Sequence, residues 1–226
     1  LSPLTPTRLV TDARAVQDYY RLRYRKESEM IAYGAEPPVR SNHLGQFGLI
    51  SGRYILYVAR LEPENNPELV IRAYRELDTD WPLVVVGGND YKPSYVRDLQ
   101  ALADDRVRFT GPIYGDSYWS LQQNAGLFVF AGEIGGVHPA LVEAMAAGNA
   151  ILYLDTAVNR ETVCGSGIPF QPTAVDLSAK MARLISSPKE VSRLGSQALE
   201  AARNTYSWEK ITDQYEQLFF SMLDNG

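Results

Sequence analysis

From residue 54 onward, short runs of apolar residues alternate with longer segments in which apolar residues recur every three or four positions. The first run is YILYVAR (54–60), and the segment after it is NPELVIRAYREL (66–77). Continuous apolar runs are typical of strands that are buried on both faces, and the longer spacing is typical of helices. Strands that alternate with helices predict a parallel sheet covered on both sides, which is a doubly wound, Rossmann-like α/β fold.

The same pattern predicts further strands and helices, without an internal repeat. The strands are expected at 82–88, 106–111, 126–132, 149–155 and 167–171. The helices are expected at 94–104, 116–125, 139–148, 174–187, 188–206 and 207–223.

Before residue 54 the pattern is less regular. TRLVTDA (7–13) predicts a short strand, ARAVQDYYRLRY (13–24) predicts a helix, and SEMIAYGAE predicts a second strand that ends at Gly34. The stretch 36–52 shows no hydrophobic period and carries several prolines and glycines, so we expect a linker or loop there. The chain opens abruptly on Leu1, and we expect it to be a fragment of a longer protein.

The loop at 131–138 carries the strongest chemical signal. In doubly wound sheets, ligands bind beyond the carboxyl ends of the strands, where this loop is expected. Gly132, Gly135 and Gly136 leave the backbone bare, and Pro139 fits the first position of the helix that follows. Free N–H groups and the positive end of a helix dipole bind anions, and Gly135 and Gly136 would let a phosphate approach the backbone closely.

Two side chains near this helix start each have two interpretations. Glu143 lies about one turn beyond Pro139, where a carboxylate stabilises a helix start by only tenths of a kcal/mol. Alternatively, Glu143 accepts hydrogen bonds from two neighbouring hydroxyls, as on a ribose, beside phosphates held by the loop. His138 lies at the mouth of the loop, where it could donate to a phosphate oxygen or cap the helix.

Other strand-end loops carry weaker candidates. Arg60 ends the first strand of the regular part and suits a phosphate or carboxylate; the alternatives are a solvated surface charge or a salt bridge with Glu62 or Glu64. VGGND (86–90) is a second glycine turn, and FTGPIYG (109–115) could present backbone groups to a flat ring. Ordinary turns contain the same residues, so neither stretch is specific by itself.

Composition excludes some classes of function. The net charge of −5 and the pI near 5.2 argue against a nucleic-acid-binding protein, which usually carries a basic face. The single cysteine, Cys164, cannot form an internal disulfide, which favours a reducing compartment, and we interpret it as a small buried hydrophobe. No apolar stretch approaches the ~20 residues that a membrane-spanning helix needs.

Motifs of several enzyme classes are missing from the sequence. There is no Walker-type phosphate loop and no GxGxxG after a first strand. His43 and His138 are far apart and lack metal-ligand spacing, and Ser166 lies in GSGIP, which lacks the spacing of a nucleophile elbow. The sequence therefore gives no support to a hydrolase or a dehydrogenase.

Taken in order, these segments resemble the retaining glycosyltransferases of family 4 (group 1), which are two-domain enzymes of the GT-B type. PALVEAMAAGNAILYLD (139–155) is similar to the donor-site segment of that family, and YILYVARLEPENNPELVIRAY (54–74) to its arginine loop and flanking elements. IAYGAE (31–36) looks like the crossover between the two domains, and YSWEKITDQYEQLF (206–219) like the closing helix. The resemblance implies a remnant of an N-terminal acceptor domain (1–35), a nucleotide-sugar-binding domain (36–205) and a closing helix (206–226).

The resemblance also implies roles for individual residues. Glu143 would bind the ribose hydroxyls, and Arg60 would face the diphosphate. The backbone of residues 136–138 would hold phosphate oxygens, and the stretch near Pro112 and Ile113 would flank the base. The implied catalytic residues are Arg60, Glu133 and His138, and the implied donor-binding residues are Asn65, Gly88, Pro112, Ile113, Gly135, Gly136, Val137 and Glu143.

Two positions depart from the family pattern. The lysine that usually lies five residues after the arginine is Asn65 here, and the usual first glutamate, eight residues before the second, falls on Gly135. Glu133 lies near position 135 but does not have the eight-residue spacing from Glu143. The diphosphate would therefore meet one cation fewer, and the sugar contact is unassigned. We hypothesise that His138 supplies part of the missing charge by titrating upward near phosphate.

The expected function is transfer of a glycosyl group from a nucleotide sugar to a glycan or lipid-linked acceptor, with retention and without a metal or other cofactor. EPENN, GGVHPALVEAM and NRET further resemble a subgroup of rhamnosyl- and galactosyltransferases of surface polysaccharides. Two alternatives remain open: a degenerate module that binds a nucleotide sugar without turnover, and a GT-B nucleotide-sugar epimerase. We expect a cytoplasmic protein with no nucleic-acid partner, inactive as this fragment, with peripheral membrane association at the inner face through the missing N-terminal domain as a further expectation.

Overall fold

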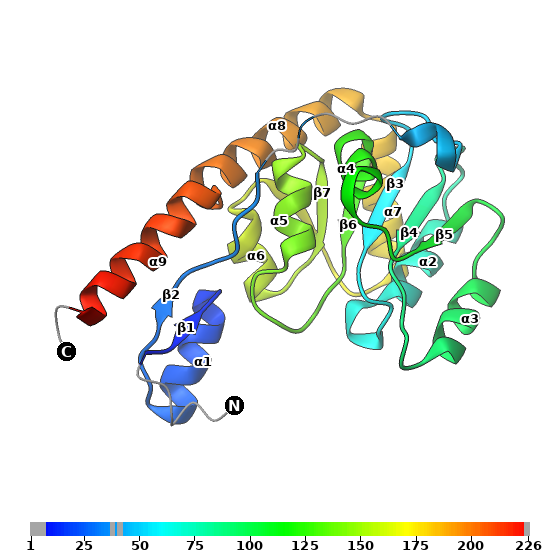
Figure 1. Cartoon of the computed structure of the whole chain (residues 1–226). Helices are drawn as coiled ribbons and strands as arrows, with labels where there is room; N and C mark the ends of the chain where they lie inside the picture. The colour runs from blue at the N-terminus through cyan, green and yellow to red at the C-terminus, as the bar shows by residue number, and fades with distance from the viewer. Residues whose placement is uncertain (1–7, 37–38, 40–42, 224–226) are drawn as a thin grey trace.

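A six-stranded parallel sheet forms the centre of the molecule (Figure 1). The computed structural model describes residues 8–36, 39 and 43–223. The strand order is β5-β4-β3-β6-β7-β8. All six strands predicted after residue 53 are confirmed, each somewhat shorter than its predicted range. Their bounds are β3 Ile55–Val58, β4 Leu83–Val86, β5 Val107–Gly111, β6 Leu127–Phe130, β7 Ile151–Leu154 and β8 Gly167–Phe170.

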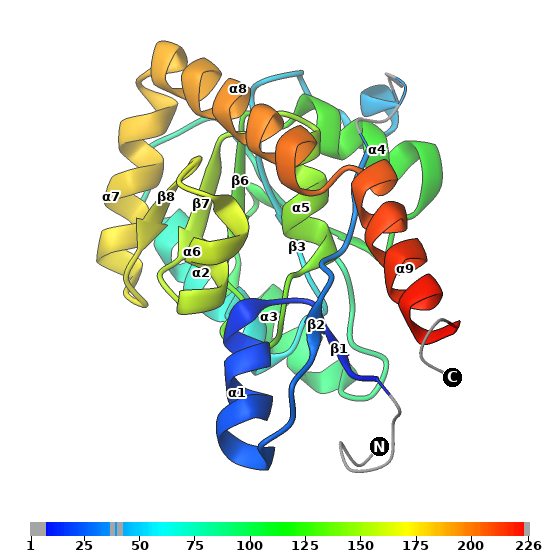
Figure 2. The ribbon, with the colours of Figure 1, turned by 90° about the vertical axis from the view of Figure 1, so that its left-hand side faces the viewer.

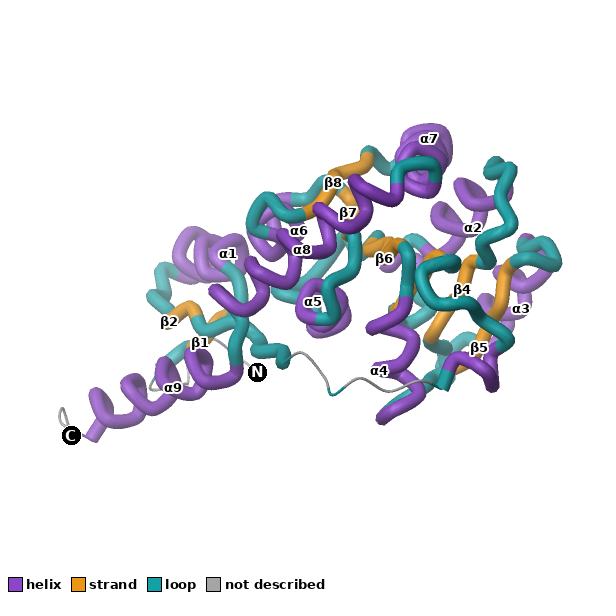
Figure 3. Tube along the Cα trace, turned by 90° about the horizontal axis from the view of Figure 1, so that it is seen from above, coloured by secondary structure: helices purple, strands orange, loops and turns teal. Residues whose placement is uncertain are grey.

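Each central strand is buried on both faces, which explains the continuous apolar runs. In β3, Leu56 packs into the apolar cluster on one face, and Ile55 and Tyr57 pack into the cluster on the other. Helices α4 and α5 and part of α8 line the first cluster, and α2, α3 and α7 line the second (Figure 3). The helices are α1 Arg14–Tyr24, α2 Pro67–Arg75, α3 Pro93–Leu102, α4 Gly115–Asn124, α5 Pro139–Ala146, α6 Ala157–Val163, α7 Ala174–Ile185, α8 Pro188–Thr205 and α9 Trp208–Leu223.

All of the predicted helices are confirmed, but the sequence pattern missed α6. This helix spans seven residues, which is too short and too polar to show a hydrophobic period. Thr156 caps it, because its hydroxyl oxygen accepts a hydrogen bond from the backbone N–H of Asn159 at 3.1 Å. Cys164 follows with a φ of 50° and is exposed, so the prediction of a buried cysteine is wrong.

The N-terminal segment forms a separate small unit beside α9 (Figure 2). Strands β1 (Val10–Thr11) and β2 (Glu29–Met30) pair in parallel, with α1 between them in sequence. Both strands are shorter than predicted: the first predicted range begins at residue 7, outside the described residues, and the second strand ends at Met30 rather than Gly34. Gly34 instead lies against Trp208, where an added Cβ would come within 2.6 Å of the indole ring.

The predicted linker at 36–52 lies partly outside the described residues, at 37–38 and 40–42. Its described part contains a short 3-10 helix at Leu44–Phe47, and Leu44 and Leu49 are buried in the first apolar cluster. The backbone N–H of His43 donates to Ser120 Oγ at 2.8 Å. Residues 43–52 are therefore anchored on α4 and pack as part of the large domain.

Candidate functional site

The strand order creates a crevice at one edge of the sheet. The chain leaves β3 toward β4 on one side, whereas β6 leads to β7 on the other, so the loops that follow β3 and β6 diverge between neighbouring strands. These loops touch at their outer ends: Asn66 Nδ2 donates to the carbonyl of Ala131 at 2.9 Å, and the N–H of Glu133 donates to the carbonyl of Glu64 at 3.0 Å. Loops 59–66 and 131–138 therefore meet.

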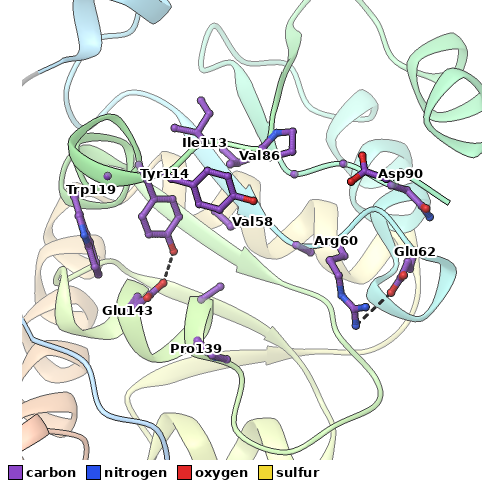
Figure 4. A pocket seen from close by; sticks show the side chains of 18 of the residues that line it. Val58, Arg60, Glu62, Val86, Asp90, Ile113, Tyr114, Trp119, Pro139 and Glu143 are labelled. Carbon is purple, nitrogen blue, oxygen red and sulfur yellow. Dashed lines mark hydrogen bonds and ion pairs between the residues drawn. The ribbon is translucent and has the colours of Figure 1, made fainter. Parts of the chain in front are cut away.

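A cavity of about 640 Å³ opens at this edge (Figure 4). Its size is in the range of small-molecule sites. The lining comes from the loops after β3, β4 and β5 and from the first turns of α4 and α5. Five of the predicted site residues lie in this lining: Arg60, Gly88, Pro112, Ile113 and Glu143.

Glu143 lies half-buried in the cavity wall, and its carboxylate accepts a hydrogen bond from the Tyr118 hydroxyl (Figure 4). Burial raises the pKa of Tyr118 well above its usual range, and the negative charge of Glu143 adds to the shift. Tyr118 is a site residue that sequence reasoning missed. A tyrosine at helical spacing from Leu121 gives the same pattern as an ordinary core aromatic residue, so the sequence held no signal for it.

Arg60 lies at the carboxyl end of β3, and its side chain is 78% exposed. The guanidinium pairs with Glu62 at 3.4 Å, which is one of the alternatives that the sequence left open. The Glu62 side chain is only 20% exposed, but the guanidinium lies in solvent, where screening limits such a pair to about 0–1 kcal/mol. The side chain can therefore exchange this partner for an anion in the cavity at little cost.

The glycine loop before α5 lies next to the cavity rather than in its lining. Among the described residues, the backbone N–H groups of residues 135–138 have no hydrogen-bond partner. The first helical residue, Pro139, does line the cavity, so the bare donors lie at its border. A side chain from the N-terminal unit reaches the same place: a Cβ added to Gly136 would lie 1.8 Å from Asp12 Oδ1. The loop thus has free donors and a neighbouring carboxylate.

His138 does not project from the mouth of the loop as predicted. Its ring packs on Phe130, with ring centroids 4.8 Å apart, and beneath Gly135. Its side chain makes no capping hydrogen bond to α5, so the capping interpretation is wrong. Burial lowers the pKa of His138, although the charge of Asp12 opposes the shift. The shift is therefore opposite to the upward titration that we hypothesised near phosphate.

Asn65 and Glu133 brace the two loops. Asn65 Nδ2 donates to the carbonyl of Arg60 at 2.8 Å, and its own carbonyl accepts from Tyr57 Oη at 2.7 Å. Glu133 Oε1 accepts from Asn66 Nδ2 at 3.0 Å. Both side chains thus hold backbone or loop partners, and neither lines the cavity.

Within the residues that the structure describes, no group of three or more His, Cys, Asp or Glu residues is arranged to hold a metal ion. None of the described helices is long and apolar enough to cross a bilayer.

The parallel sheet, its central crevice and the bare helix start define a Rossmann-like domain that matches one half of the GT-B glycosyltransferases. The family model for glycosyl transferases group 1 matches residues 49–201. The chain belongs to this family.

Three individual relatives that match this chain share less than 30% sequence identity with it. The N-acetylgalactosamine-N,N'-diacetylbacillosaminyl-diphospho-undecaprenol 4-alpha-N-acetylgalactosaminyltransferase of Campylobacter jejuni is 28% identical over 107 residues, covering 47% of this chain and 29% of the relative. Sucrose-phosphate synthase from Thermosynechococcus elongatus superimposes with a TM-score of 0.84 at 20% identity, over 96% of this chain and 58% of that chain. HepE from Anabaena, in complex with UDP-glucose, superimposes with a TM-score of 0.86 at 17% identity, over 95% of this chain and 64% of that chain. The chain therefore spans only part of the length of these relatives.

Proposed function

We propose that this chain is the donor-binding part of a retaining glycosyltransferase of family 4, which transfers a glycosyl group from a nucleotide sugar to a glycan or lipid-linked acceptor. The observation that carries the proposal is the place of Glu143, on the cavity wall about one helical turn from a loop with unpaired N–H donors. A carboxylate for ribose hydroxyls and donors for phosphate at such close range suit a nucleoside diphosphate. The Anabaena relative was solved with UDP-glucose, and the name of the Campylobacter jejuni transferase includes a diphospho-undecaprenol-linked sugar.

The cavity offers a place for each part of such a donor. Glu143 takes the ribose, and the wall at Pro112 and Ile113, with Gly88 beside Pro112, takes the base. The diphosphate lies toward the start of α5, where helix-start donors and Arg60 supply positive potential. We propose that donor binding needs no metal, and we expect chelation by EDTA to leave donor binding unchanged.

Breaking the bond between sugar and diphosphate moves negative charge onto the leaving group and positive charge onto the sugar ring. The amides at 135–138 and Arg60 stabilise the growing negative charge. Asn65 orients the Arg60 backbone but adds no charge. The group that activates the acceptor would come from the other domain of a longer protein. We place this chain in the subgroup that builds surface polysaccharides with rhamnosyl or galactosyl units, in the cytoplasm and at the inner face of the membrane.

Calorimetry with UDP, GDP, ADP and dTDP tests the donor site directly. We expect at least one of them to bind, and Glu143→Gln to weaken that binding by about 10- to 100-fold, because a hydrogen bond to a charged group contributes roughly 1.5–3 kcal/mol. Glu190→Gln is the matched control, since Glu190 pairs with Arg183 on the far helices α7 and α8. No binding of any nucleotide, or equal affinities in both variants, would refute the proposal.

The second candidate is a module that binds a nucleotide sugar without turnover, and the departures at Asn65 and Gly135 motivate it. Product analysis with the longer protein separates the candidates: a transferred sugar supports the transferase, an inverted sugar centre supports an epimerase, and binding without product supports the degenerate module. The 226-residue chain alone is expected to bind weakly and to transfer nothing. Transfer by this chain alone would contradict the proposal that one domain binds the donor and the other activates the acceptor.

A further inference from the structure

A row of four polar side chains runs from the core of the domain to the cavity. Asn149, just before β7, is buried and approaches Gln122 of α4, with Nδ2 3.4 Å from Gln122 Oε1. Gln122 Nε2 lies 2.9 Å from Tyr118 Oη, one turn earlier in α4. Tyr118 Oη in turn bonds to Glu143 Oε2 on α5 (Figure 4). The row therefore ends on the carboxylate that faces the cavity.

The direction of each hydrogen bond follows from groups that can act in only one way. Asn149 Nδ2 lies 2.8 Å from the carbonyl oxygen of Gln122 and 3.2 Å from that of Ala144, and carbonyls only accept, so an amide nitrogen must face them. Those two carbonyls take both protons of the Asn149 amide, so the direction at Tyr118 follows from the other end of the row. The Glu143 carboxylate only accepts, so the Tyr118 hydroxyl donates its proton to Glu143, and the Tyr118 oxygen accepts from Gln122 Nε2.

This row fixes one oxygen of Glu143 and leaves the other free. Oε2 is held by Tyr118, whereas Oε1 has no hydrogen-bond partner among the described residues. A carboxylate that is already oriented loses less conformational entropy when a ligand arrives than one that rotates freely. Burial keeps the pKa of Tyr118 high, so the hydroxyl remains a donor at every pH at which the protein functions.

We propose that Tyr118 is a positioning residue for nucleotide recognition: it holds the Glu143 carboxylate so that Oε1 meets the ribose hydroxyls, and it makes the site selective for nucleotides that carry them. This inference rests on the proposed function, in which Glu143 binds ribose. It adds that selectivity depends on a second side chain of the cavity wall, which Gln122 holds in place.

The test compares UDP with 2′,3′-dideoxy-UDP, which lacks both ribose hydroxyls, by calorimetry; the GDP or ADP pair replaces them if the nucleotide survey selects that base. The wild-type protein should prefer UDP by about tenfold or more. Tyr118→Phe should lower the UDP affinity by roughly three- to tenfold and change the dideoxy affinity by less than about twofold, so the preference shrinks. Tyr206→Phe is the matched control, because it removes a buried hydroxyl bond to the Thr162 carbonyl at 2.9 Å, away from the cavity.

The possible outcomes separate the two proposals. A wild-type protein that binds both nucleotides equally overturns the ribose role of Glu143, and this inference with it. A wild-type preference that survives unchanged in Tyr118→Phe overturns only the role of Tyr118. If Tyr118→Phe unfolds, Gln122→Met gives a second measurement with the same expected direction, because it removes the bond that holds the Tyr118 hydroxyl, together with the long contact to Asn149, and leaves Tyr118 and Glu143 in place.

Discussion

Replacing Asp12 with asparagine should tighten the binding of a nucleoside diphosphate, the reverse of what most substitutions at a binding site do. The carboxylate of Asp12 lies against Gly136, since an added Cβ there would come within 1.8 Å of its Oδ1. The N–H groups of the same loop are the proposed phosphate donors. A bound diphosphate would therefore meet a like charge at close range.

The size of the effect follows from the charges. Two like unit charges about 5 Å apart repel by roughly 3 kcal/mol at an effective dielectric constant of about 20. Asp12 is half-buried at an open corner, so water and salt reduce the repulsion to about 1–2 kcal/mol. Asp12→Asn keeps the shape of the side chain and removes the charge, and we expect the Kd for UDP to fall by about 5- to 30-fold.

Calorimetry at low and high salt tests this value. The gain from Asp12→Asn should be largest at about 0.05 M salt and should shrink at about 0.5 M, because screening weakens the repulsion that the substitution removes. Asp18→Asn is the control: Asp18 lies on the same N-terminal unit but pairs with Arg21 at 2.6 Å on the exposed face of α1. Unchanged or weaker binding by Asp12→Asn at low salt would show that the carboxylate does not compete with the phosphates.

Two further predictions concern stability. Gly87 has a φ of 135°, and an added Cβ would lie 1.9 Å from the carbonyl oxygen of Ala59, so Gly87→Ala should lower the free energy of unfolding by about 3 kcal/mol or more, measured by urea denaturation. Gly45→Ala, where nothing lies within 4 Å, should be nearly neutral. Burial lowers the pKa of His138 below its ordinary value of 6.5, so the unfolded chain takes up this proton at a higher pH than the folded chain does. Stability from this group is complete above pH ~6.5 and is lost as the pH falls through the folded pKa. When stability is measured by thermal unfolding, His138→Gln should therefore lose less of it between pH 7.5 and pH 5 than the wild-type protein does. Equal slopes of stability against pH in the two proteins would contradict the burial argument.

The sequence predicted the sheet because its central strands are buried on both faces. The strands β3, β4, β6 and β7 are each a run of four apolar residues, and such runs are visible without a structure. The seven residues of α6 and the two-residue strands of the N-terminal unit are too short to show a period. The fold of that unit depends on contacts with α9, such as Ile31 with Ile211, which no local pattern reveals.

The candidate site was predicted as far as its chemistry lies within one loop and its helix. Bare glycines, Pro139 and Glu143 are close in sequence, so their meeting follows from a strand followed by a helix. Asp12 and Tyr118 reach the same site from distant segments, and they are ordinary residues for the elements that carry them. The packing of His138 on Phe130 was equally hidden, because it depends on how the loop folds back on β6.

The two ends of the cavity differ in how ready they are for a ligand. At the nucleoside end, Tyr118 already holds Glu143; at the diphosphate end, Asp12 covers Gly136. The second phosphate of UDP therefore meets a repulsion that the nucleoside does not. The affinity of UDP consequently exceeds that of UMP by less than the free N–H groups alone would provide. Asp12→Asn should raise the preference for UDP over UMP, whereas Tyr118→Phe should lower the affinity for both nucleotides by the same factor. An equal UDP preference in Asp12→Asn and the wild-type protein would mean that the N-terminal unit moves away before the phosphates bind.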